Sequence, residues 1–196
     1  MTIDQIDSHP LTPLSVATNG NNSIYIAQET CEIIKTDFDF KLISIIGQQF
    51  AIPTKIIFYE GSLYVCDSYN FRLQELNEEL ILQESYALNF KPWKFNIIQN
   101  TACVRPIGET FVSFYNLKPF YFKAKVHDVS GDILAFKSWF YLFQNENSQF
   151  VCFDVNGLIV EDVVIKIKKC IAFDAILYKN ENVIMAVTEE KKLILV

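Results

Sequence analysis

Apolar and polar residues alternate along the whole chain in short runs with a period of two residues. Alternation of this kind predicts half-buried β-strands, and the enrichment in β-branched and aromatic residues agrees with it. The clearest runs lie at residues 23–27, 62–66, 71–76, 149–154 and 183–187. Short polar turns separate them, and Asn156-Gly157 is typical of a tight hairpin turn. Residues 73–83 could also form a short helix, but strand, turn and strand fit the neighbouring runs better.

The predicted strands recur at a regular spacing. Similar apolar runs begin at residues 23, 62 and 101, so the spacing is 39 residues, and Pro53 and Pro92 are also 39 residues apart. A repeat of about 40 residues with four short strands in each unit is typical of β-propeller blades. The sequence therefore predicts an all-β fold, a β-propeller-like repeat of four-stranded antiparallel blades.

The spacing divides the chain into about four to five blades within a single domain, residues 1–196. We expect a leader at 1–12 and blades at approximately 13–47, 53–88, 92–128, 131–167 and 168–196. The strand register after Asp128 stays open, because residues 139–143 could be a first or a second strand. Most repeat propellers have about six or seven blades, within a range of about four to eight, so whether four to five blades close a ring alone is also open. The last residues, 193–196, form an apolar run that we expect to pair with another strand.

Residues 52–76 place Pro53 before the first predicted strand, Asp67 at the end of the second, and Asn70 and Arg72 at the start of the third. This pattern resembles an NHL repeat. The resemblance implies structural roles, in which Asp67 and Asn70 tie the loop between strands and Arg72 packs across the blade. NHL propellers, like WD-repeat propellers, mostly serve as binding platforms. The resemblance therefore implies that this protein is a platform for protein or RNA partners.

Composition and charge narrow the class of protein. The chain has 196 residues, 51% of them hydrophobic, and carries 17 basic against 23 acidic side chains, a net charge of −6. Such a chain can bury a large core, and its acidic balance disfavours nucleic acid. It has neither an apolar run of about 18 residues nor a signal peptide, so we expect a soluble, cytoplasmic protein without membrane insertion. Its five cysteines form no Cys-x-x-Cys pair, which indicates free thiols in a reducing compartment.

Catalytic signatures are scarce. The two histidines, His9 and His127, stand in no triad context, and the sequence has no nucleotide-binding loop and no zinc spacing. We therefore expect no enzyme activity, no cofactor and no metal. The alternative is a small propeller hydrolase or lyase with a carboxylate or metal site in the central channel. Its candidate acids, each also explained as a turn or strand-end residue, are Asp67, Glu109, Asp154 and Asp174.

Protein binding is the better supported use. The residues Tyr69, Phe71, Arg72, Trp93 and Lys94 lie at or near predicted strand ends, where propeller loops emerge. Tyr, Trp and Arg dominate interface hot spots, although Phe71 and Trp93 could instead fill the wedge between blades. We expect an interaction scaffold or a subunit of a larger assembly, whose protein partner could complete the propeller by strand addition. A third reading is a propeller that binds single-stranded RNA.

Overall fold

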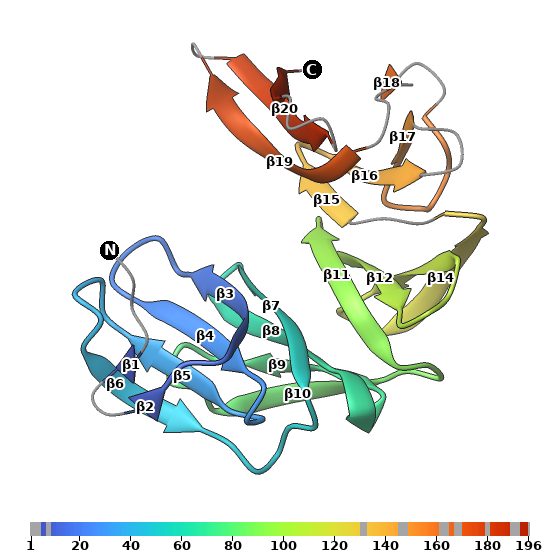
Figure 1. Ribbon diagram of the computed structural model, residues 1–196. Helices are drawn as coiled ribbons and strands as arrows, with labels where there is room; N and C mark the ends of the chain where they lie inside the picture. The colour runs from blue at the N-terminus through green and yellow to red at the C-terminus, as the bar shows by residue number, and fades with distance from the viewer. Residues whose placement is uncertain are drawn as a thin grey trace. The chain divides into compact units, whose positions relative to one another are not determined.

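A computed structural model of the chain describes residues 5–6, 9–129, 133–144, 149–160, 165–166, 170–178, 181–188 and 193–195. The described residues are nearly all β, with one short 3₁₀ turn (Figure 1). They fall into two compact units, residues 1–94 and 95–196, which are described separately below. Within the described residues, no helix is long and apolar enough to cross a membrane.

The first unit holds two antiparallel four-stranded sheets in which each strand pairs with the next along the chain. The first sheet contains β3 (Pro13–Thr18), β4 (Ile24–Gln28), β5 (Ile33–Thr36) and β6 (Leu42–Ile46). The second contains β7 (Pro53–Tyr59), β8 (Ser62–Asp67), β9 (Arg72–Leu76) and β10 (Leu82–Ala87), with the 3₁₀ turn η1 (Ser68–Asn70) between β8 and β9. A short hairpin of β1 (Gln5–Ile6) and β2 (His9–Pro10) precedes them.

The core of the first unit lies between its two sheets. Buried Tyr25 stacks on Phe58 with ring centroids 5.6 Å apart, and Leu63 and Val65 lie in the same cluster. The Ser15 hydroxyl accepts a hydrogen bond from the Ile56 amide at 3.1 Å, so β3 is also tied to β7 by a polar contact. Each fully buried aliphatic or aromatic side chain here contributes about 1.5–3 kcal/mol.

The other face of the first sheet carries a second apolar cluster. Ile26 and Ile34 are buried there together with Ile6 from the short hairpin. Val16, which pairs directly with Ile26 across β3 and β4, stays 61% exposed. The hairpin therefore covers part of this apolar face and leaves the side chain of Val16 in solvent.

The second unit contains the remaining sheets, and the boundary between the units falls within β11. The third sheet consists of β11 (Pro92–Ile98), β12 (Thr101–Pro106), β13 (Phe111–Asn116) and β14 (Tyr121–His127). The fourth consists of β15 (Ile133–Phe136), β16 (Trp139–Gln144), β17 (Gln149–Phe153) and β18 (Ile165–Lys166). The last has three strands among the described residues: β19 (Cys170–Tyr178), β20 (Glu181–Thr188) and β21 (Leu193–Leu195).

Three aromatic rings form the centre of the core of the second unit. Phe114 lies edge-on to Phe140 at 5.5 Å between centroids and 6.1 Å from Phe153. Gly157 approaches this cluster so closely that an added Cβ would lie 3.0 Å from a ring carbon of Phe114. Its φ of 77° also favours glycine, as the Asn-Gly turn signal predicts.

The predicted fold class, a propeller-like array of four-stranded antiparallel blades, is confirmed. The open register is also settled, because β16, beginning at Trp139, is the second strand of its sheet. The helical alternative for residues 73–83 is wrong. The Asn77 side-chain oxygen accepts the amides of Glu79 and Ile81, which makes a local turn that competes with a helix. The single-domain assignment stays a prediction.

Candidate partner-binding site

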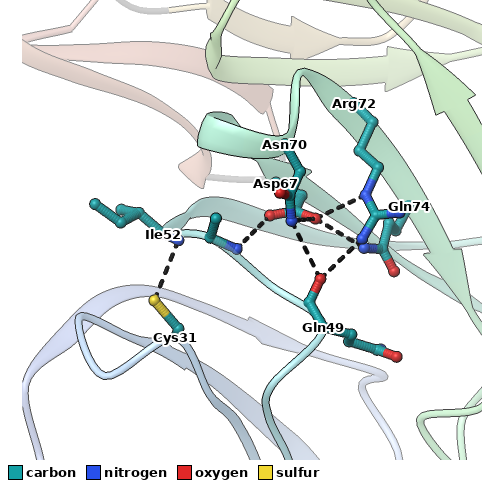
Figure 2. Close-up of polar contacts among 8 residues, drawn as sticks. Cys31, Gln49, Ile52, Asp67, Asn70, Arg72 and Gln74 are labelled. Atoms are coloured by element: carbon teal, nitrogen blue, oxygen red, sulfur yellow. Dashed lines mark hydrogen bonds and ion pairs between the residues drawn. The ribbon is translucent and has the colours of Figure 1, made fainter.

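The site begins at a buried carboxylate at the end of β8. Asp67 is fully buried and pairs in register with Arg72, the first residue of β9. Its Oδ2 accepts hydrogen bonds from Asn70 Nδ2, Arg72 Nε and Gln74 Nε2, each at 2.8 Å, and its Oδ1 accepts the Ala51 amide at 2.6 Å (Figure 2). Four donors compensate the cost of burying this charge. We call this arrangement the Asp67 hub.

The hub also fixes the segment that connects the two sheets. The Gln49 carbonyl accepts hydrogen bonds from Arg72 Nη2 at 2.8 Å and from Asn70 Nδ2 at 3.2 Å (Figure 2). The sulfur of Cys31, a residue of the first sheet's β4–β5 turn, accepts a hydrogen bond from the Ile52 amide at 3.3 Å. The connection and the turn η1 are therefore held by side chains of both sheets.

The backbone of η1 is held as firmly as its side chains. The Tyr69 amide donates to the Ala51 carbonyl at 3.0 Å, and the Phe71 carbonyl accepts the Leu88 amide at 2.7 Å. Phe71 adopts a left-handed conformation with φ of 55°, which costs a non-glycine residue about 1–2 kcal/mol. This conformation turns the chain between η1 and β9, and Tyr69 and Phe71 remain 50% and 43% exposed.

The start of β11 lies against the same turn. The Ser68 hydroxyl donates to the Pro92 carbonyl, and the Thr54 hydroxyl, 2.7 Å from that of Ser68, donates to the Trp93 carbonyl at 2.8 Å. Trp93 is 43% exposed. These hydroxyl contacts hold the backbone that carries Trp93 beside the backbone that carries Tyr69 and Phe71.

Lysine side chains lie over the exposed rings. Lys91 Nζ is 4.1 Å from the ring centroid of Tyr69 and 5.8 Å from that of Phe71, and Lys94 Nζ is 5.9 Å from the Trp93 ring. Cations at such distances are attracted to the ring faces. We name Tyr69, Phe71, Lys91, Trp93 and Lys94 the aromatic–lysine patch.

The structure places four of the five expected partner-binding residues in this patch and the fifth, Arg72, in the hub beneath it. Phe71 and Trp93 are each 43% exposed, which disfavours the alternative in which their rings fill the wedge between blades. Sequence reasoning missed Lys91. The alternation of basic and aromatic residues around Pro92, from Lys91 to Lys94, is the signal that could have identified it.

The acids considered for a catalytic channel have local roles where they are described. Asp67 belongs to the hub, and buried Pro53 pairs opposite it on β7. Asp154 Oδ1 accepts the amides of Asn156 and Leu158, which forms a turn. Glu109 lies exposed in the connection between β12 and β13, and the Asp174 side chain lies outside the described side chains.

The described residues contain no group of three metal-ligating side chains. Burial raises the pKa of the Cys66 thiol, next to Asp67, and that of the Cys103 thiol well above the ordinary value. These thiols stay protonated near neutral pH, where a thiolate would be needed for nucleophilic attack or metal binding.

Antiparallel sheets of four strands, each a meander and repeated along the chain, define this protein as β-propeller-like in architecture. No family model matches the sequence, and no curated protein matches it. Several solved structures, however, resemble the structure of this chain. The structure of BBS1N in complex with ARL6DN has a TM-score of 0.76 at 9% identity over 96% of this chain, and BamB from Moraxella catarrhalis has 0.69 at 8% over 99%.

Virginiamycin B lyase from Staphylococcus aureus is similar with a TM-score of 0.68 at 11% identity over 94% of this chain. These neighbours are β-propeller proteins. This chain covers 65%, 61% and 69% of the lengths of the three chains, in the order in which they are named. At such low identities the similarity shows the fold alone.

Proposed function

We propose that this protein is a non-catalytic protein-interaction scaffold, or a subunit of a larger assembly, that binds a partner through the aromatic–lysine patch. The observation that carries the proposal is that three half-exposed aromatic side chains lie on two backbone segments that hydrogen bonds hold together. Aromatic side chains supply large contact areas at interfaces and lose little conformational entropy. A loop that is already ordered also lowers the cost of association.

One propeller neighbour supports this use, because its structure is that of a complex, BBS1N with ARL6DN. Another neighbour is a lyase, so fold similarity alone does not favour binding over catalysis. The engagement of Asp67 and Asp154 in local hydrogen bonds is what supports a non-catalytic role. No described contact favours the hydrolase or lyase alternative.

The test compares proteins that co-purify with three forms of the full chain. The patch variant combines Tyr69→Ser with Trp93→Ser. The control combines Tyr121→Ser with Phe122→Ser, since these rings on β14 are also about half exposed, at 50% and 54%. We expect one partner at constant stoichiometry with the wild type and the control, and its loss with the patch variant. Equal recovery with all three forms would refute a role for the patch.

We also propose that a partner strand adds to the sheet formed by β19, β20 and β21. This sheet has three strands among the described residues, whereas each of the four sheets from β3 to β18 has four. A strand edge offers backbone donors and acceptors to a partner strand. Hydrogen exchange tests the idea: adding the co-purified partner should slow exchange at residues 193–195. Unchanged exchange there, with the partner bound, would contradict strand addition.

A further inference from the structure

Lys91 is the central cation of the aromatic–lysine patch. Its ammonium lies against two rings, 4.1 Å from the centroid of Tyr69 and 5.8 Å from that of Phe71. No described carboxylate forms an ion pair with it. A ring face attracts an ammonium but replaces few of its hydrogen bonds, and a lysine has three N–H donors. Lys91 therefore retains donors for an acceptor that comes from outside the chain.

The described contacts of the Lys91 ammonium are two aromatic rings, and no described carboxylate pairs with it. Asp67, the acid nearest along the chain to Tyr69, is fully buried, and its contacts are made inside the hub. Lys94, whose ammonium lies 5.9 Å from the Trp93 ring centroid, follows on the other side of Pro92. None of the five residues that define the patch is an acid, although the net charge of the chain is −6.

We propose that the aromatic–lysine patch binds an acidic segment of a partner protein. An Asp or Glu carboxylate of that segment accepts hydrogen bonds from the Lys91 ammonium, and an adjacent apolar side chain packs on Tyr69 and Phe71. This inference rests on the proposed function and adds the chemistry of the partner. Charge-assisted contacts of this kind are the stronger hydrogen bonds.

A protein segment fits the patch better than RNA does. Single-stranded RNA is bound by aromatic stacking together with a basic groove that follows several phosphates. The patch offers only two lysines, and the acidic chain around it repels a polyanion. A single carboxylate beside an apolar side chain needs one cation and one ring surface, which Lys91 and Tyr69 supply.

The experiment selects peptides from a random phage-displayed library on the full chain. We expect the enriched peptides to place Asp or Glu beside an aromatic or aliphatic residue. A selected peptide, labelled with a fluorophore, is then titrated in an anisotropy assay. Lys91→Gln should lower the affinity for the peptide about tenfold, whereas Lys91→Arg should retain most of that affinity. The matched control is Lys125→Gln, which removes another lysine that lies over a ring, 3.5 Å from the Phe111 centroid, and should change nothing.

Replacing the peptide's acid by its amide should weaken binding to the wild type by the same factor and leave binding to Lys91→Gln unchanged. Selected peptides without an acid, or equal affinity for wild type and Lys91→Gln, would overturn the inference. If such peptides still lose affinity with Tyr69→Ser, the proposed function stands and only the acidic chemistry fails. Tighter binding of oligouridylate than of any peptide, lost with Lys91→Gln, would overturn both in favour of RNA.

Discussion

The Asp67 hub makes a quantitative prediction about stability. In Asp67→Asn the amide can keep its oxygen toward Asn70, Arg72 and Gln74, and its NH₂ group then faces the Ala51 amide, which lies 2.6 Å from Oδ1 in the wild type. A donor facing a donor there costs about 1–3 kcal/mol. The loss of the ion pair with Arg72, whose side chain is 28% exposed, adds up to about 1 kcal/mol after solvent screening.

We therefore expect Asp67→Asn to lower the free energy of unfolding by about 1–4 kcal/mol. Urea denaturation, followed by circular dichroism and fluorescence, measures it. Asp154→Asn is the matched control, because one carboxylate oxygen of Asp154 accepts the amides of Asn156 and Leu158, and an asparagine oxygen can accept both. Its change should stay below about 1 kcal/mol.

Hydrogen exchange adds a local measurement. The Tyr69 amide donates to the Ala51 carbonyl and the Phe71 amide to the Ser68 carbonyl, so loss of the hub should speed exchange at both amides. The control Asp154→Asn should leave them unchanged. A loss of less than about 0.5 kcal/mol in Asp67→Asn, with wild-type exchange at Tyr69, would refute the assignment of the hub as the support of the turn.

Three further changes test the packing and the titration of buried groups. Gly157→Ala should lower the free energy of unfolding by about 2–4 kcal/mol, because the added Cβ would lie 2.9 Å from the Cβ of Ala124. Gly108→Ala, where φ is 72° and no atom is close, should lower it by about 1–2 kcal/mol. Equal urea midpoints for the two variants would contradict the clash. Ile6→Ser should lower the thermal midpoint, because Ile6 is buried against the first sheet, and an unchanged midpoint would count against a stabilising hairpin. Stability should fall as the pH rises from 9 to 11, because burial raises the pKa of Cys152 to about 11 from its ordinary 9.0, so the unfolded thiol loses its proton first. Urea midpoints at both ends of this range measure the fall, and Cys152→Ala should make it shallower; an equal fall in that variant would contradict the role of Cys152.

The fold was accessible from the sequence because two periods agree. The alternation of two residues predicts strands, and the spacing of 39 residues between the runs at 23, 62 and 101 predicts their grouping into blades. For residues 73–83 the alternation allowed either a helix or two strands, and side-chain hydrogen bonding decided between them. Asn77 offered a turn to the backbone, and that local competition removed the helical alternative.

Part of the hub was also predictable. The resemblance to an NHL repeat brought Asp67, Asn70 and Arg72 together, and all three are in contact. Gln74 was missed, although it lies two residues after Arg72 and therefore on the same face of the strand. The role of Gln49 could not be read from its side chain, because its backbone carbonyl is the group that accepts the two hydrogen bonds.

One of the exposed aromatic residues, Phe71, has a backbone conformation that local preference disfavours. Phe71 has a positive φ, and a Phe at such a position gives no sequence signal of the kind that glycine gives. The contacts of the Asp67 hub across η1 support this conformation, so the hub is linked to the residues proposed to bind a partner. It follows that Asp67→Asn should reduce both stability and partner binding, whereas Lys91→Gln should reduce binding alone. A variant set in which stability and binding always fall in parallel would show that the patch has no binding role separate from the fold.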